Sequence, residues 1–275
     1  MSERLEHLVE EVDRAHATAT SIEALARSTR DAVSRRIRAK DFLLDCVDRI
    51  VDAVAAASEE TPTLRGGGPD LHVNERLRYR FKVFFWAPGF ESAPHQHNTW
   101  GVTGVLHNRS SVVLYRNEGE PDPHGARLVA ERSISAEAGE VGYLLPPCMH
   151  SVGNPGESIS ATFHVFTDSP DEDQRQNDTV WYPKPGGRSP TKGPRYNALR
   201  GCAEILARID DARSVQLLER IFGLGGPYVK LVCAKAMAAM DPRWGAARRD
   251  HLRASLPDAL RETLASAGDL QALAY

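Results

Sequence analysis

Apolar residues recur at helical spacing near both ends of the chain. From residue 3 to about residue 60 they fall three or four positions apart, which predicts two or three amphipathic helices. After residue 195 the same spacing returns in three segments that Asp-Asp and Gly-Gly-Pro breaks separate, and weaker helical stretches continue to Tyr275. The chain is therefore expected to begin and end in helices.

The middle of the chain, from residue 71 to about residue 168, follows a different pattern. Its β-branched and aromatic residues gather in short runs that Gly, Pro, Asn or Asp residues bound. These runs cover residues 79–86, 100–106, 111–115, 141–145 and 158–167. Short strands at this spacing are typical of a β-sandwich or a closed barrel. The turn-rich run of residues 61–70, with its consecutive glycines, predicts a domain boundary before the strands.

Residues 169–194 are polar and rich in Pro and Gly, with Trp181 and Tyr182 as their large apolar groups. This composition predicts an irregular linker, which the aromatic pair pins to the rest of the protein. The expected organisation is N-terminal helices over residues 1–60, a barrel over 71–168, the linker over 169–194 and a helical extension over 195–275.

The helices of the C-terminal extension carry small residues on their packing faces, as in a short helical stack of the HEAT kind. Two or three such units cannot bury a core of their own. We therefore expect them to pack on the barrel or on a second subunit, and the second arrangement would form a homodimer through the helical extensions.

Composition narrows the class of protein. The chain is 41% hydrophobic and 26% charged, and its net charge of −3 gives no reason to expect a nucleic-acid partner. No segment approaches the ~18 consecutive apolar residues of a membrane-spanning helix. The four cysteines are widely spaced without a CxxC pair, and the first residues contain no apolar signal region. These features predict a cytoplasmic protein with reduced thiols.

Three histidines carry the strongest indication of chemistry. His95 and His97 stand two positions apart, so on a strand both imidazoles point to the same face. His150 follows about fifty residues later, after a Pro-Pro turn. Three imidazoles brought together in this way could form a facial site for a divalent metal.

The sequence around these histidines resembles the two cupin motifs. The first is the Gly-containing segment 89–101, which includes the His-x-His pair, and the second spans residues 139–154 and ends in His-x-x-x-Asn. Many cupins carry a carboxylate ligand where this chain has Gly101. The resemblance therefore implies an all-histidine site with up to three open metal positions. Ferrous iron, Fe(II), fits because substrate and dioxygen could bind side by side, and ligand identity also leaves nickel, copper and zinc as alternatives.

Among cupins with three histidines, residues 79–170 are similar to the cysteine dioxygenase family, and most of all to its bacterial 3-mercaptopropionate dioxygenase branch. The matching pieces are residues 86–89, 93–106, 150–154 and 162–166, within a region that covers about a third of the chain. The resemblance implies a cupin jelly-roll barrel, and the C-terminal helices lie outside the family's usual extent.

The family carries a Ser-x-His-x-Tyr string after the third metal ligand, and this chain has Thr162, His164 and Phe166 in its place. The resemblance implies that His164, oriented by the Thr162 hydroxyl, contacts dioxygen or substrate during catalysis. Phe166 cannot donate a hydrogen bond, so the tyrosine's role is absent or has moved. Val102 occupies the position of the cysteine that some members crosslink to tyrosine, which excludes that crosslink.

A thiol-bearing acid also needs a cation for its carboxylate, and a guanidinium can supply two parallel hydrogen bonds. The candidates are Arg78, Arg80, Arg116 and Arg175. We favour Arg80 and Arg175, the latter because the bacterial branch places an arginine at a similar distance after His164.

Two further residues lie near the motifs. Trp100 is expected either to wall the substrate pocket or to belong to the barrel core. Cys148 is interpreted as a packed thiol beside the third histidine and not as a nucleophile.

The sequence thus predicts a mainly β protein, a cupin jelly-roll barrel flanked by N-terminal helices and a C-terminal helical extension. The predicted function is a non-heme iron(II) dioxygenase that uses O2 to oxidise a small thiol-bearing acid to a sulfinate. Two alternatives remain: an iron oxygenase acting on a non-thiol substrate, and a non-catalytic cupin that binds a metal or a small molecule.

Overall fold

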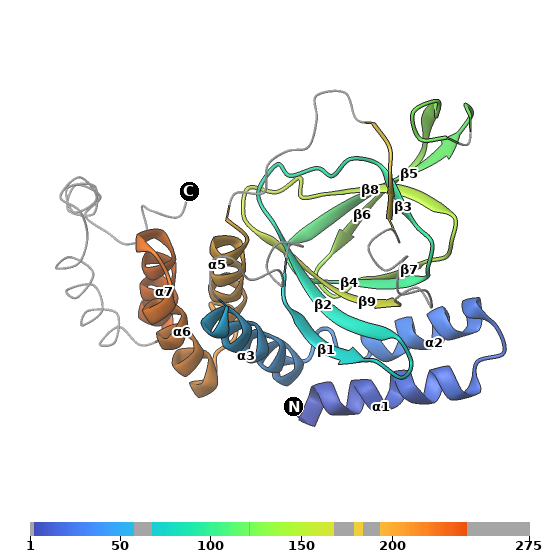
Figure 1. The fold of residues 1–275 in the computed structure, drawn as a ribbon. Helices are drawn as coiled ribbons and strands as arrows, with labels where there is room; N and C mark the ends of the chain where they lie inside the picture. The colour runs from blue at the N-terminus through green and yellow to red at the C-terminus, as the bar shows by residue number, and fades with distance from the viewer. Residues whose placement is uncertain (1–2, 58–67, 121, 168–178, 184–192, 241–275) are drawn as a thin grey trace.

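Two antiparallel sheets form the centre of the molecule (Figure 1). The computed structural model describes residues 3–57, 68–120, 122–167, 179–183 and 193–240. The first sheet has the order β1-β2-β9-β4-β7, with strands Asp70–Asn74, Tyr79–Trp86, Ser160–Thr167, Gly101–His107 and Val141–Leu144. The second has the order β10-β3-β8-β5-β6, with strands Thr179–Trp181, His95–His97, Cys148–Gly153, Arg109–Asn117 and Leu128–Glu137. This two-sheet arrangement, of the jelly-roll kind, confirms the predicted fold class.

Helices cover the outer face of the first sheet (Figure 1). The N-terminal ones are α1 (Glu3–Thr18), α2 (Ile22–Ser34) and α3 (Lys40–Ala56), as the apolar spacing predicts. The buried stripe of α1 consists of Leu5, Leu8, Val12 and Ala15, three or four positions apart. The Ser21 side chain begins α2 by accepting a hydrogen bond from the Ala24 amide at 3.1 Å.

Strand β2 shows how one sequence serves both faces of the first sheet. Its residues alternate between buried and half-buried along the whole strand. The buried set, Tyr79, Phe81, Val83 and Phe85, belongs to the core beneath the helices. The alternate set, Arg80, Lys82, Phe84 and Trp86, lies on the other face of the sheet, because successive strand side chains point to opposite faces. This inner face of the first sheet is directed toward the second sheet and forms one wall of the barrel interior.

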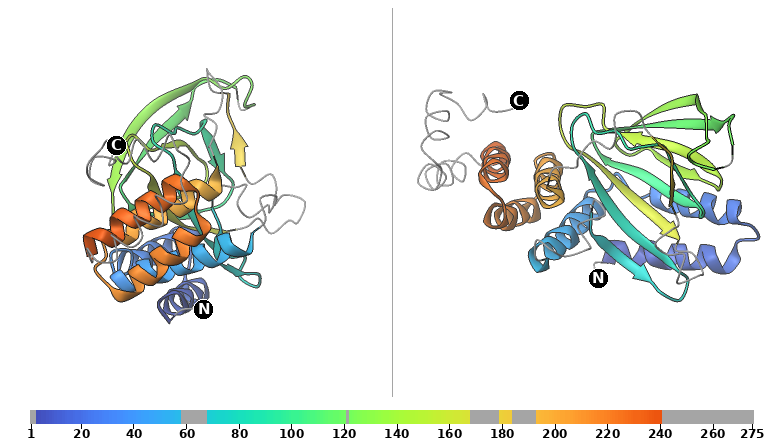
Figure 2. Two further views of the ribbon diagram at one scale, coloured as in Figure 1. Left: turned by 90° about the vertical axis from the view of Figure 1, so that its left-hand side faces the viewer. Right: turned by 45° about the horizontal axis from the view of Figure 1, so that its top comes forward.

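The C-terminal helices α5 (Pro194–Leu206), α6 (Ala212–Leu224) and α7 (Pro227–Met240) stack beside α3 at one end of the molecule (Figure 2). Helix α5 also packs on β2, where a Cβ added to Gly201 would lie 2.4 Å from the Phe85 ring. Between α6 and α3, Arg220 pairs with Asp48 and Asp52, and Arg213 lies 2.9 Å from Asp45. Within this chain, the described part of the extension therefore packs on the barrel and on the N-terminal helices through α5 and α6.

The structure also contains strands that the residue pattern does not predict. Strand β6 is mostly exposed, so it lacks a buried run. Strand β10 lies inside the segment predicted to be an irregular linker, and it forms because it pairs with β3 about eighty residues earlier. The weaker helical stretches after residue 240 fall outside the described residues. Among the residues that are described, no helix combines the length and apolar character needed to cross a membrane.

Candidate metal centre

Strand pairing in the second sheet brings the three histidines together. Strands β3 and β8 are antiparallel, and His95 lies directly opposite His150. Their ring centroids are 4.4 Å apart, and the His97 centroid lies 5.0 Å from that of His95 and 5.3 Å from that of His150. One nitrogen from each ring lies within 4.8 Å of the other two. This spacing suits three nitrogen ligands on one divalent ion, because such ligands bind at about 2.0–2.1 Å.

Backbone carbonyls fix the tautomers of two of these imidazoles. His95 Nδ1 lies 2.9 Å from the carbonyl oxygen of Ala93, and His150 Nδ1 lies 3.0 Å from that of Cys148. A carbonyl oxygen only accepts, so each Nδ1 carries the proton and each Nε2 presents a lone pair. Histidines that bind metals commonly make this hydrogen bond through the second ring nitrogen.

Burial favours the neutral form of two of these imidazoles, those of His97 and His150. Loss of hydration lowers the pKa of His150, and burial together with the nearby His150 lowers the pKa of His97 to about 4. Neutral imidazole is the form that binds a metal ion. At neutral pH His97 and His150 can therefore act as ligands without first losing a proton.

The Phe166 ring lies beside Gly101, the position at which β4 has no side chain to offer a fourth ligand. Gly101 and Phe166 are opposite each other on β4 and β9, and a Cβ added to Gly101 would lie 3.2 Å from the Phe166 ring. The Phe166 centroid is 5.7 Å from that of His97. A side chain at position 101 would begin in tight contact with this ring, which would have to shift by a few tenths of an ångström to admit it. Within the described residues, the site is built from histidines alone.

His164 lies on the inner face of the first sheet, opposite the three histidines. Each of its ring nitrogens lies within hydrogen-bonding distance of a threonine hydroxyl. Thr162 Oγ1 is 2.7 Å from Nε2, and Thr103 Oγ1 is 2.9 Å from Nδ1. The Trp86 indole also donates to Thr162 Oγ1 at 2.8 Å. Burial lowers the pKa of His164 to about 3, so the ring is neutral. The Thr162 contact expected from the sequence is present, and His164 must release one hydroxyl before it can contact a substrate.

Strand β10 adds contacts at the metal centre. Sequence reasoning missed the strand and Thr179, whereas it expected Trp181 and Tyr182 to hold this segment against the rest of the protein. Thr179 Oγ1 lies 3.1 Å from His97 Nδ1, and the Trp181 ring centroid is 4.5 Å from that of His95. The Tyr182 hydroxyl donates to Gln96 at 3.1 Å, which anchors the end of the strand. The available signal was the sequence Thr-Val-Trp, three residue types that favour strands, inside an otherwise polar segment.

The predicted substrate-binding residues have different positions. Arg80 lies on the barrel-facing side of β2 opposite Phe166, with Nη1 3.3 Å from Asp70 Oδ2. Trp100 is 5% exposed in the core, where its centroid is 6.0 Å from that of His16 on α1. Arg116 is a surface residue paired with Glu118 and Glu131. Arg175 lies outside the described residues.

Sequence reasoning did not name Lys82, the second cation on the barrel-facing side of β2. It lies opposite His164 in the strand register, and its charge contributes to the lowered pKa of that histidine. The alternation that places Arg80 on this face places Lys82 there as well, so the signal was present in the strand pattern.

No protein-family model matches the chain. A mutant of Bacillus subtilis oxalate decarboxylase is 20% identical over 38% of this chain and 24% of that protein, with a TM-score of 0.28. A Klebsiella pneumoniae protein with a double-stranded β-helix domain is 18% identical over 49% of this chain and 95% of its own, with a TM-score of 0.29. A cupin superfamily protein of Desulfitobacterium hafniense is 10% identical over 36% and 72%, with a TM-score of 0.26. Similarities this weak do not indicate the activity of this chain.

Proposed function

We propose that this chain is a metal-dependent cupin enzyme, an iron(II) dioxygenase that converts a small thiol-bearing acid to a sulfinate. One observation carries the proposal: the three imidazoles of His95, His97 and His150 converge, and backbone carbonyls hold two of them with Nε2 available as a ligand. In the overall reaction a thiolate R–S⁻ and O2 give R–SO2⁻, so both oxygen atoms pass to sulfur and no further reductant is needed.

The donor set fits ferrous iron. Three neutral nitrogen ligands without a carboxylate leave the ion its full charge and open positions on one side. Bound iron would supply the redox chemistry that allows dioxygen to react with a thiolate. The Phe166 ring reinforces the all-histidine character, because it occupies the space next to Gly101.

The wall opposite the histidines supports an anionic substrate. Arg80 and Lys82 lie on the barrel-facing side of β2, across the strand pair from Phe166 and His164. A cation on this wall would bind a carboxylate through charge-assisted hydrogen bonds and hold the thiol end toward the three imidazoles. The aromatic rings of Phe84 and Phe166, which contact His164, keep that part of the interior apolar.

Oxygen uptake by the iron-loaded protein tests this function. We expect turnover of 3-mercaptopropionate or cysteine, and weaker turnover of cysteamine, because cysteamine has no carboxylate for a cation to bind. The sulfinate product should match the oxygen consumed in a ratio of one to one. Uptake no greater than that of a His97→Ala control with all three thiols would contradict the proposal.

A second candidate is an iron oxygenase that acts on a non-thiol substrate. The observation that favours it is the engagement of both His164 nitrogens by threonine hydroxyls, with Phe166 where the thiol enzymes have tyrosine. Full iron loading without turnover or spectroscopic binding of any of the three thiols would favour this candidate.

A further inference from the structure

Strand β10 pairs with β3, the strand that carries two of the three histidines of the metal centre (Figure 1). In the antiparallel register Thr179 lies opposite His97, and Trp181 lies opposite His95. Residues directly opposite each other in an antiparallel pair share one face of the sheet, so Thr179 and Trp181 lie on the face that carries the two imidazoles. Strand β10 therefore forms one edge of the metal centre, although Thr179 and His97 stand 82 positions apart.

His97 differs from the other two histidines in the partner of its Nδ1 atom. His95 and His150 each direct Nδ1 to a backbone carbonyl two residues earlier in the chain. Nδ1 of His97 instead lies 3.1 Å from the Thr179 hydroxyl. The orientation of His97 thus depends on a side chain from a distant part of the sequence, whereas the orientations of the other two are set locally.

The Thr179 hydroxyl determines which nitrogen of His97 is available to a metal ion. Because Oγ1 of Thr179 engages Nδ1, Nε2 is the nitrogen that remains. When Nε2 binds a cation, Nδ1 carries the proton and donates it to the hydroxyl oxygen. A hydrogen bond of this kind orients the ring and raises its basicity, and its removal typically costs roughly 10–100-fold in metal affinity.

Few contacts attach β10 to the barrel. The strand has three residues at the edge of its sheet, and Trp181 is 42% exposed. Just after the strand, the Tyr182 amide donates to the Pro94 carbonyl at 2.9 Å, and the Tyr182 hydroxyl donates to Gln96 at 3.1 Å. Segments with so few buried contacts open at a low cost in free energy. One further interaction at His97 is therefore expected to change how firmly β10 is held.

From these observations we infer that Thr179 is a positioning residue of the metal centre, and that metal binding and the attachment of β10 strengthen each other. With β10 attached, Thr179 holds His97 in the orientation that binds the ion. A bound ion fixes His97 in turn and so stabilises its hydrogen bond to Thr179. Thermodynamic linkage requires the two effects to be equal in size. This inference rests on the metal centre of the proposed function and is independent of the substrate.

Anaerobic titration of the full, metal-free chain with ferrous iron tests the role of Thr179. Thr179→Val keeps the branched shape of the side chain but removes the hydroxyl, and we expect it to raise the Kd for iron by about 10–100-fold. Thr179→Ser restores a hydroxyl and should recover most of the affinity. The matched control is Thr103→Val, which removes the hydroxyl beside Nδ1 of His164. His164 is outside the three-histidine group, so this control should leave the Kd unchanged.

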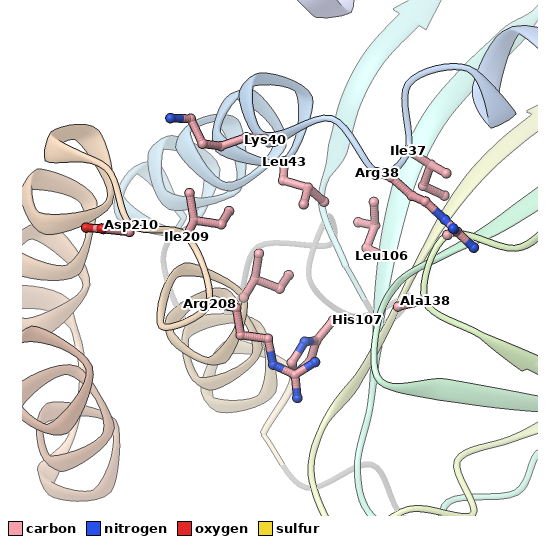
Figure 3. Close-up of a pocket in the computed structure, with 12 residues that line it drawn as sticks. Ile37, Arg38, Lys40, Leu43, Leu106, His107, Ala138, Arg208, Ile209 and Asp210 are labelled. Atoms are coloured by element: carbon pink, nitrogen blue, oxygen red, sulfur yellow. The ribbon is translucent and has the colours of Figure 1, made fainter. Parts of the chain in front are cut away.

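Hydrogen exchange at the Tyr182 amide measures the attachment of β10, because this amide donates to Pro94 beside β3. We expect ferrous iron to slow its exchange in the wild type by a factor similar to the change in Kd, and to have little effect in Thr179→Val. A second control is His107→Gln, at the other end of β4, where His107 borders a separate cavity together with Arg208 (Figure 3). This substitution should change neither quantity.

The outcomes separate this inference from the proposed function. Equal iron affinity in the wild type and Thr179→Val, or exchange at Tyr182 that iron does not alter, would overturn the inference and leave the proposed function intact. Wild-type protein that binds no ferrous iron would contradict both. The comparison of the wild type with and without iron needs no variant, so it tests the inference even where a substitution disturbs folding.

Discussion

The two faces of the first sheet use the same strands for different purposes. On the outer face, residues such as Phe81 and Phe163 are fully buried beneath the helices. On the inner face, Thr162 and His164 alternate with Phe163 along β9 and form a network of hydrogen bonds opposite the metal centre. The strand period of two therefore divides stability from chemistry within each strand, and a substitution should affect mainly the face to which it points.

The largest expected effect comes from removing an aromatic ring from the outer face. Phe163 is 0% exposed, and its ring centroid lies 5.5 Å from that of Phe42 on α3. Phe163→Ala should lower the free energy of unfolding by about 3–5 kcal/mol, because it leaves a cavity between sheet and helices. Phe166→Ala on the half-buried inner face should cost clearly less. Urea denaturation measures the free energy of unfolding of both variants. An equal loss in the two would contradict the division between a stabilising outer face and a chemical inner face.

Removing a hydroxyl group from the inner face should lower the free energy of unfolding by less than removing the Phe163 ring from the outer face. Thr162→Val removes the acceptor of the Trp86 indole and the partner of His164 Nε2, whereas Thr103→Val removes only the partner of His164 Nδ1. We expect Thr162→Val to lower the free energy of unfolding by roughly 1–3 kcal/mol, because buried donors lose their partners. Thr103→Val should cost less, and denaturation curves in which it costs more would contradict this description of the network.

Much of this division could be predicted from the sequence, because it depends on local alternation. The predicted strand over residues 79–86 coincides with β2, and the helical spacing of the first sixty residues became α1 to α3. The contacts that could not be predicted are non-local. Thr103 and His164 stand 61 positions apart, and they meet only because β4 and β9 pair in one register.

The same limit applies to Trp100 and to Thr179. Trp100 precedes Gly101, the first residue of β4, yet its ring packs toward His16 on α1 and not toward the three histidines of the metal centre. Thr179 reaches His97 because a three-residue strand pairs with β3 across 82 positions. Spacing along the chain identifies which residues share a face, but pairing and helix packing decide what that face meets.

A smaller effect should appear in the helical layer that covers the outer face. Arg36 and Arg35 lower the pKa of Glu11 from 4.5 to about 2 in the folded protein. The lowered folded pKa means that ionised Glu11 favours folding above pH 4.5, and that this contribution is lost as the pH falls toward 2. Glu11→Gln should therefore cost about 1 kcal/mol at neutral pH and less at pH 3, since a partly exposed pair is screened by solvent.

Denaturation at several pH values measures this difference between the wild type and Glu11→Gln. The matched control is Glu23→Gln, which removes an exposed carboxylate that pairs with Arg27 within the same helix. We expect the control to change stability little at any pH. A Glu11→Gln penalty that grows as the pH falls would have the wrong sign for a lowered pKa.

The most direct test of the metal centre is elemental analysis of anaerobically purified protein, with His97→Ala and His164→Ala prepared in parallel. We expect close to one iron per wild-type chain, loss of the metal in His97→Ala, and retention in His164→Ala, since His164 lies on the opposite sheet with both ring nitrogens near threonine hydroxyls. Wild-type protein that binds no divalent metal, or a His97→Ala variant that keeps its full metal content, would contradict the account.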